Sequence, residues 1–366
     1  MNVRQTLIEE LEAAIANSDV RQRADVLRRV TDLFAAGSSG YSKEQVALFD
    51  DVMCRLVDEV ESSARATFGK RLAAMEKAPP NLVRTLALDD SIDVAGPILA
   101  GCETIDEASL IESAKTKGQD HLLAISRRRS LGGTVTDVLV DRGDRQVAIS
   151  TVVNPGARFS EFGYSTLIKR SENDGDLALR LWSRRDIPRQ HLLRLFAESS
   201  EAVRRKIQTA DRRNADLVRD LIAEAASQLQ GRSRDDSPVY KAARDRVEML
   251  QRSGQLDEAR LFAFAQSEKF DETALALSRM CDLPIGVIER AMVNDGTEQV
   301  IVLAKAVGLS WQTTKAILAV RPGGSGTLAH HFEQILSNFN KLKPETAGKA
   351  IEFYRMRERA SHTASA

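Results

Sequence analysis

The stretch Glu272-Thr-Ala-Leu-Ala-Leu-Ser-Arg-Met-Cys-Asp-Leu283 recurs further along the chain as Glu298-Gln-Val-Ile-Val-Leu-Ala-Lys-Ala-Val-Gly-Leu309. The offset is 26 residues throughout, and Ala291-Met292 recurs as Ile317-Leu318 at the same offset. Apolar residues spaced three and four apart mark one face of a helix. A repeat of this length is typical of stacked helix pairs, because each pair needs a neighbour to bury its apolar face. The sequence therefore predicts two consecutive helix pairs in this region.

A related pattern recurs four times between Asp93 and Phe196, at steps of 25 to 30 residues. Each first helix is expected to begin at an aspartate, which would cap it by accepting unpaired backbone N–H groups. These residues are Asp93, Asp120, Asp144 and Asp176. Each second helix carries an apolar pair: Leu110-Ile111, Val138-Leu139, Leu167-Ile168 and Leu192-Leu193. Four further helix pairs are therefore predicted.

Helices are also predicted on both sides of these four pairs. In the first part of the chain they cover residues 4–16, 20–36 and 43–61, where apolar residues form one stripe. Ser42 with Gln45 is a candidate capping box that opens the third of these helices. Residues 199–229 read as one long helix, and the polar stretch 230–238, with Gly231 and Pro238, is the expected linker.

Four segments in the first hundred residues carry a resemblance: Thr31-Asp-Leu-Phe34, Glu44-Gln-Val-Ala-Leu-Phe-Asp-Asp-Val52, Lys70-Arg-Leu-Ala73 and Pro79-Pro-Asn-Leu-Val-Arg-Thr-Leu-Ala-Leu-Asp-Asp-Ser-Ile-Asp-Val-Ala-Gly-Pro-Ile-Leu99. Together they resemble a bacterial family of uncharacterised proteins, domain of unknown function 2336. The similarity runs from about residue 20 to about residue 320 and is more specific before Gly231 than after it. The resemblance implies HEAT-like helical repeats. It implies no activity and no catalytic residues.

Repeats and resemblance together predict an all-α fold, namely an α-solenoid of HEAT-like helix pairs with a smaller C-terminal helical domain. The N-terminal repeat domain is expected over residues 1–230 and the C-terminal domain over residues 239–355. Residues 356–366 are charged and then small and polar, so we expect this tail to fray.

Composition narrows the class of protein. Lys and Arg together number 52, as do Asp and Glu, so the chain as a whole lacks the basic excess of a typical nucleic-acid-binding protein. The charge is uneven, however: residues 1–118 hold 14 basic and 20 acidic side chains, and residues 119–214 hold 18 and 12. The N-terminus has no signal-peptide pattern, and no apolar stretch approaches the roughly 20 residues of a membrane span. A cytoplasmic location is therefore expected.

Motifs for catalysis or metal binding are missing from the sequence. The adjacent His330 and His331 would point in different directions on a helix, and there is no HExxH or Cys/His cluster. The three cysteines, Cys54, Cys102 and Cys281, are far apart and form no CxxC pair. No GxSxG elbow or phosphate-binding loop is present. The sequence predicts no enzyme, no metal and no cofactor.

A group of arginines in the middle of the chain is the sharpest functional signal. The candidate binding ridge consists of Arg127, Arg128, Arg129, Arg184, Arg185, Arg189, Arg204 and Arg205. Several follow the expected end of a first helix, so stacking would bring them to one edge. Cations also favour helix C-termini for structural reasons alone, worth about 0.3–1 kcal/mol each. The functional alternatives are an acidic protein surface and nucleic acid, on whose bases Trp182 and Tyr164 would then stack.

The resulting functional prediction is a protein-binding scaffold or adaptor, with a regulatory role left open, that docks a partner on a repeat face. The alternative is a nucleic-acid-binding protein that uses the basic edge of the repeats. The long helix also carries an apolar stripe that includes Val203, Ile207 and Leu217 with Asn214, so a homodimer through this seam stays open.

Overall fold

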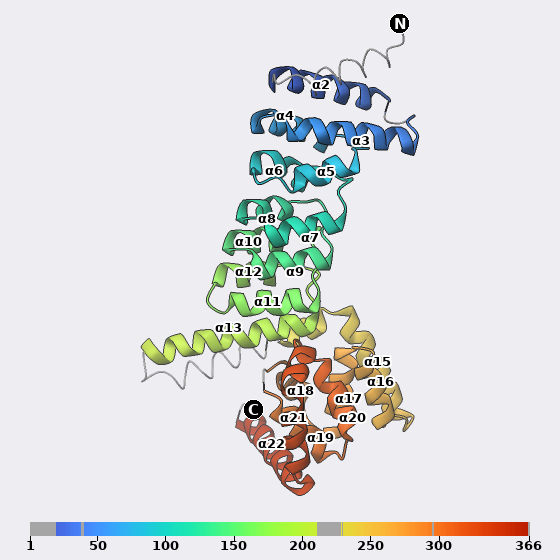
Figure 1. Ribbon diagram of the computed structural model, residues 1–366. Helices are drawn as coiled ribbons and strands as arrows, with labels where there is room; N and C mark the ends of the chain where they lie inside the picture. The colour runs from blue at the N-terminus through green and yellow to red at the C-terminus, as the bar shows by residue number, and fades with distance from the viewer. Residues whose placement is uncertain (1–19, 38–39, 211–227, 229, 295, 365–366) are drawn as a thin grey trace. The chain divides into compact units, whose positions relative to one another are not determined.

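The computed structural model describes residues 20–37, 40–210, 228, 230–294 and 296–364. Every regular element in these residues is a helix, which confirms the predicted all-α class (Figure 1). One isolated parallel bridge, between Leu131 and Ala157, is the exception to purely helical pairing in the described part of the chain. The predicted helix at residues 4–16 lies outside the described residues.

The chain divides into two compact units, residues 1–163 and residues 164–366, which we call unit 1 and unit 2. The division falls inside helix α11, Glu161–Ser171, and so does not coincide with the expected linker at 230–238. The predicted domains, 1–230 and 239–355, stay a prediction. Each unit is described by itself below.

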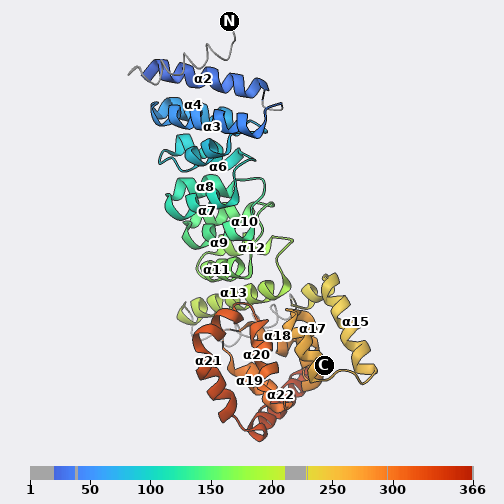
Figure 2. The same ribbon diagram turned by 45° about the vertical axis from the view of Figure 1, so that its right-hand side comes forward.

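Unit 1 is a stack of short helices in two rows (Figures 1 and 2). In chain order its helices are α2 Val20–Gly37, α3 Lys43–Asp58, α4 Ser62–Ala73, α5 Pro80–Ala87, α6 Ile92–Gly101, α7 Glu107–Thr116, α8 Gln119–Ser126, α9 Gly133–Arg142 and α10 Arg145–Val153. Helix α6 packs between α4 and α8, and α8 packs on α10, while α3, α5, α7 and α9 pack on one another in the same order. This alternation is compatible with the predicted solenoid.

Local sequence signals explain where these helices begin. Ser42 and Gln45 form the predicted capping box of α3, with both reciprocal hydrogen bonds present. Asp144 caps α10, since its side chain accepts from the N–H of Val147. The other three predicted aspartate caps were wrong by a few residues: Asp93, Asp120 and Asp176 lie in the first turn of their helices. There a carboxylate still stabilises the positive end of the helix dipole.

Side chains that follow one helix hold the C-terminus of the helix one repeat earlier. The guanidinium of Arg128, just after α8, donates to the carbonyl oxygens of Leu99 at 2.8 Å and Cys102 at 2.9 Å, at the end of α6. Asn154, just after α10, donates to the carbonyls of Ser126 and Arg128, at the end of α8. Carbonyls at a helix end lack partners inside the helix. These bonds therefore both satisfy them and fix the spacing of successive repeats.

Two loops of neighbouring repeats also pair through their backbones. Leu131 donates its N–H to the carbonyl of Gly156 at 3.0 Å and accepts from the N–H of Arg158 at 2.9 Å. A Cβ atom at position 156 would lie only 1.8 Å from the carbonyl oxygen of Arg129, so the loops approach this closely because residue 156 is glycine.

A continuous apolar core runs through unit 1 from Leu27 to Ala157. Asp50 of α3 is the one carboxylate that unit 1 buries among its described residues. Its two oxygens accept the N–H groups of Asn81 and Leu82 at 2.9 Å and 2.8 Å, in the first turn of α5. The carboxylate therefore serves as a cap supplied from a neighbouring helix, which agrees with the structural role expected for acids at helix starts.

Unit 2 contains longer helices around its own core, which runs from Leu193 to Ile351. Its helices after α11 are α12 Gly175–Trp182, α13 Arg189–Ala210, α15 Pro238–Arg252, α16 Glu258–Gln266, α17 Phe270–Cys281, α18 Ile285–Val293, α19 Glu298–Ala306, α20 Trp311–Ala319, α21 Gly324–Lys341 and α22 Pro344–Ala364. Helix α20 begins and ends 26 residues after α18, so the second predicted repeat is confirmed in its helix bounds.

Two sequence expectations in unit 2 were wrong. Residues 230–235 of the expected linker are helical, and only Asp236 and Ser237 separate them from α15. Helix α22 continues to Ala364 where a frayed tail was expected, because residues 352–359 are mostly good helix formers. Most of the predicted long helix 199–229 lies outside the described residues, beyond Ala210.

Candidate functional site

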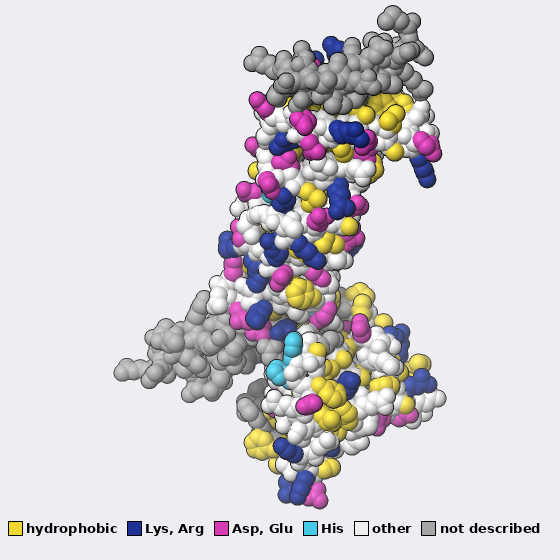
Figure 3. Space-filling model, viewed as in Figure 1, with side chains coloured by type: hydrophobic (Ala, Val, Ile, Leu, Met, Phe, Trp, Pro, Cys, Tyr) yellow, Lys and Arg dark blue, Asp and Glu magenta, His cyan; other side chains and the backbone are white. Residues whose placement is uncertain are grey.

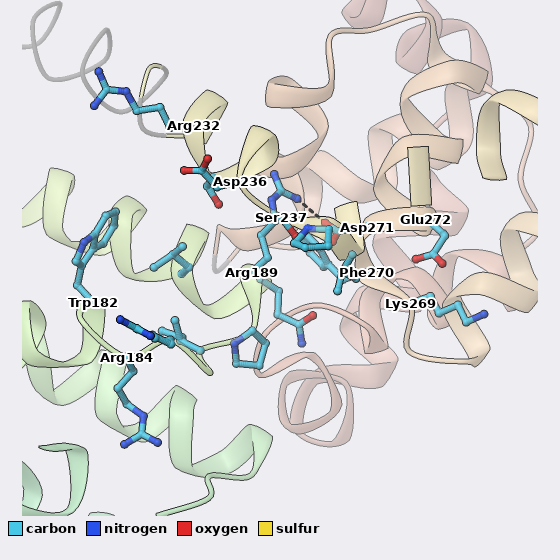
Figure 4. A pocket seen from close by; sticks show the side chains of 18 of the residues that line it. Trp182, Arg184, Arg189, Arg232, Asp236, Ser237, Lys269, Phe270, Asp271 and Glu272 are labelled. Carbon is cyan, nitrogen blue, oxygen red and sulfur yellow. Dashed lines mark hydrogen bonds and ion pairs between the residues drawn. The ribbon is translucent and has the colours of Figure 1, made fainter. Parts of the chain in front are cut away.

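A cavity of about 990 Å³ opens in unit 2 where three helices begin. Its wall comes from the turn between α12 and α13, from residues 232–239 at the start of α15, and from residues 268–272 at the start of α17. Figure 4 shows Arg189 in the middle, with Trp182 and Arg184 on one side and Lys269 and Glu272 on the other. The start of α15 is set by Ser237, whose hydroxyl accepts from the N–H of Tyr240, and by Pro238 at the first helical position.

A buried charge network forms the inner wall of the cavity. The guanidinium of Arg189 makes ion pairs with Asp271 of α17 and Glu289 of α18, and Glu289 pairs also with Arg234 at 2.9 Å. The side chain of Glu289 is 0% exposed, and those of Arg189 and Asp271 are 7% exposed. The ring of Tyr240 lies beneath the guanidinium, 4.5 Å from its central carbon. Four chain segments are thus tied together at one arginine.

The electrostatics of this network favour a permanently charged Arg189. Burial opposes the charge, but Glu289 and Asp271 outweigh burial and hold the pKa of Arg189 above its ordinary value. Breaking one partner of a buried ion pair is costly, because it leaves the other charge uncompensated. The position of the cavity wall is therefore fixed by electrostatics as well as by packing.

The rest of the lining is largely apolar. Trp182 is half-buried and packs edge-on against Phe196, with ring centroids 3.8 Å apart. Phe270 is buried, whereas Val239 is 69% exposed at the cavity mouth. An exposed valine beside a half-buried indole gives the cavity an apolar surface that water covers poorly.

Charged side chains surround the opening. Arg185, Arg232 and Lys269 are exposed and line the cavity, and no ion pair with another described residue is found for any of them. Asp236 and Glu268 are the acidic counterparts in the same position. The remaining lining charges have partners: Arg184 pairs with Asp186, Glu272 with Arg246, and Arg189 with the buried acids. The balance at the opening is slightly positive.

The predicted ridge residues of unit 1 face in different directions. Arg127 and Arg129 are exposed just after α8, whereas Arg128 between them is half-buried and bound to the α6 carbonyls. Figure 3 shows, on the face that it views, basic and acidic side chains mixed along unit 1 with no strip of a single sign.

The predicted ridge residues of unit 2 are also divided. The Arg184 side chain is buried and binds both carboxylate oxygens of Asp186, at 2.9 Å and 2.7 Å. Arg189 is enclosed in the network, and Arg185 is exposed. Arg204 and Arg205 belong to α13, but their side chains lie outside the described residues. The cavity thus brings Arg184, Arg185 and Arg189 together, and the sequence had not indicated their acidic partners.

Comparison with known proteins places the chain in a group. A family model described as "Uncharacterised protein conserved in bacteria (DUF2336)" matches residues 94–352. The chain belongs to this family. The family resemblance seen in the sequence is thereby confirmed, although the matched stretch begins at residue 94 and so leaves out most of the segments that carried it. No curated protein matches the chain, and no solved structure does.

Other polar residues of this DUF2336 member are explained by the fold. His121 is buried, and its Nε2 lies 3.0 Å from the carbonyl oxygen of Asp89. His191 is buried and stacks on Tyr164, with ring centroids 4.8 Å apart. Tyr164 is therefore enclosed in packing and is not exposed for stacking on a base. His330 and His331 are exposed where α21 is kinked, with ring centroids 6.5 Å apart.

The cysteines of this family member resemble core residues. Burial raises the pKa of the Cys54 thiol to about 11 and that of the Cys281 thiol to about 12. Thiols with such values carry almost no thiolate at neutral pH, and the thiolate is the reactive form. Among the described residues, no group of three His, Cys, Asp or Glu side chains is placed to hold a metal ion. Within the same residues, no helix is long and apolar enough to cross a membrane.

Proposed function

We propose that this chain is a cytoplasmic scaffold or adaptor that binds a protein partner and has no catalytic activity of its own. The observation that carries the proposal is the arginine run 127–129. Arg128 anchors the run to the preceding repeat, and Arg127 and Arg129 stand exposed on both sides of it. Two cations on a backbone held in this way are pre-organised for an acidic surface, which lowers the entropy lost on binding.

A protein partner is favoured over nucleic acid by the surroundings of these cations. Basic and acidic side chains alternate over unit 1, whereas a nucleic-acid surface is typically a continuous basic stripe. The two aromatic residues that would stack on bases are packed within unit 2, since Tyr164 lies on His191 and Trp182 on Phe196. Mixed charge on successive repeats is suited to the orientation and specificity of a protein contact.

The test reverses the two exposed charges with Arg127→Glu and Arg129→Glu. Arg128 is left intact because it supports the fold. The matched control is Lys43→Glu with Lys77→Glu, which reverses two exposed cations elsewhere in unit 1. We expect the double reversal to weaken capture of the partner from host lysate at least about fivefold at low salt, and less at high salt, because exposed charges are screened. Equal capture by the double variant and the control at both salt concentrations would contradict the proposal.

A further inference from the structure

The unit 2 cavity is the strongest unassigned feature of the molecule outside the repeat surface. It is built from three helix starts, at Pro188–Arg189, Ser237–Val239 and Lys269–Phe270, and all three lie in one unit. A volume of about 990 Å³ is at the upper end of ordinary ligand pockets. A space of this size accommodates several side chains of a peptide.

The wall of the cavity is rigid. Arg189 is held by two acids and lies over Tyr240, and Arg234 holds Glu289 from a second segment. Replacing such a buried network with apolar residues is often neutral or stabilising, so stability alone does not account for it. A network of this kind fixes the positions of the segments that it joins, and here these segments are the cavity wall.

The charge at the opening selects an acidic ligand. Arg185, Arg232 and Lys269 have no ion-pair partner among the described residues, and they outnumber Asp236 and Glu268. The N-terminal ends of α13 and α15 add to this, since neither helix has an acidic residue in its first turn. In addition, the Nε–H of Arg189 is buried and has no acceptor among the described residues.

The apolar lining selects a second property of the ligand. Trp182 is half-buried, Phe270 is buried and Val239 is 69% exposed, so a bulky apolar side chain entering the cavity would cover surface that water now contacts. We infer that the cavity binds an acidic peptide segment that inserts one bulky apolar side chain beside Trp182. This inference rests on the proposed protein-binding function and names the kind of partner segment involved.

The test selects peptides on the full chain without assuming a sequence. A displayed library of random peptides is panned against the wild-type protein and then against Arg185→Glu/Arg232→Glu/Lys269→Glu. The matched control is Arg260→Glu/Lys343→Glu/Lys349→Glu, which reverses three exposed cations of unit 2 outside the cavity. We expect enriched peptides to be acidic with one aromatic or large aliphatic residue. They should bind the cavity variant about tenfold more weakly and the control within about twofold.

A second variant and a spectroscopic signal keep the test independent of folding defects. Val239→Ser changes an exposed residue and should weaken the same peptides about threefold or more without lowering the melting temperature. The chain has two tryptophans, so Trp311→Phe leaves Trp182 as the single indole reporter. Its emission should shift when an enriched peptide binds.

Three outcomes would overturn the inference: no enrichment, enrichment of neutral or basic peptides, or equal weakening by the cavity and control variants. The proposed scaffold function fails separately. A lysate partner retained equally by the wild type and the cavity variant would leave the scaffold intact and remove the cavity from its mechanism. Cavity-dependent peptides combined with no protein captured from lysate would contradict the scaffold function alone.

Discussion

Unit 1 and unit 2 are both built from short helix pairs, yet they treat buried charge differently. Among its described residues unit 1 buries one carboxylate, Asp50, and backbone N–H groups satisfy it. Unit 2 buries Asp271, Glu272 and Glu289, and arginines satisfy them. Unit 1 therefore uses charge to complete helix ends, whereas unit 2 uses it to join distant segments around a cavity.

Both units share a second device, which makes the contrast sharper. Arg128 in unit 1 and Arg321 in unit 2 each follow a helix and donate to carbonyls at the end of the helix one repeat earlier. Arg321 is 6% exposed and reaches the carbonyls of Met292, Asn294 and Gly296, while Arg128 is half-buried and reaches two. Stacking is thus solved alike in both units, and the charge network of unit 2 is an addition to it.

The largest expected effect separates the two kinds of buried carboxylate. Glu289→Ala should lower the free energy of unfolding by about 3–5 kcal/mol, because it leaves Arg189 and Arg234 uncompensated. Asp50→Ala should cost less, about 1–3 kcal/mol, because it leaves only backbone N–H groups unpaired. Urea unfolding of both variants measures the difference. A smaller loss for Glu289→Ala than for Asp50→Ala would break the comparison.

The two stacking arginines provide the next test. Arg321→Ala should lower the free energy of unfolding by about 2–4 kcal/mol and Arg128→Ala by about 1–3 kcal/mol, since more carbonyls lose a charged donor at the more buried site. Thermal and urea unfolding of the two variants, with the exposed Arg127→Ala as control, rank them. If Arg128→Ala behaved like its exposed neighbour, the repeat-to-repeat capping role would be wrong.

A third prediction concerns the loop pairing in unit 1. Gly156→Ala places a methyl group 1.8 Å from the carbonyl of Arg129, so the loops must separate. The expected cost is about 1–3 kcal/mol of unfolding free energy. Gly118→Ala is the matched control, because nothing lies within 4 Å of a Cβ at that position. Equal stability of the two variants would show that the loops do not pair in solution.

The smallest predicted effect is a pH dependence present in both units. Hydrogen bonds from the backbone of Ser109 lower the pKa of Asp106 in unit 1, and those from Ser310 and Thr313 lower the pKa of Glu258 in unit 2. A carboxyl whose folded pKa is lowered stabilises the protein above its ordinary pKa of 3.8 or 4.5, and this contribution disappears as pH falls through the lowered value. Asp106→Asn and Glu258→Gln should therefore melt below the wild type at about pH 7 and converge with it at about pH 2. A constant difference across this range would contradict the assignment.

Much of the fold could be predicted because helix pairs repeat in the sequence. The 26-residue offset gave the relation between α18 and α20, and the Ser42–Gln45 box gave the start of α3. The aspartate caps were misplaced because an acid is favourable both at the cap and in the first turn, so residue type alone does not separate these positions.

The cavity could not be predicted, because its residues come together only in three dimensions. Glu289 corresponds in the 26-residue repeat to Lys315, which is exposed, so the repeat pattern itself points to a surface position for Glu289. Its burial depends on Arg189, 100 residues earlier in the chain. The ridge hypothesis found Arg184, Arg185 and Arg189 as basic residues. It could not distinguish the exposed one from those bound to Asp186, Asp271 and Glu289.

The central claim is that this chain functions by holding a protein partner. The most direct measurement is affinity purification of the tagged full chain from its host lysate, with and without nuclease, followed by mass spectrometry. The account predicts one protein recovered in near-stoichiometric amount that survives nuclease treatment. Recovery that depends on nucleic acid, or the absence of any such protein, would contradict it.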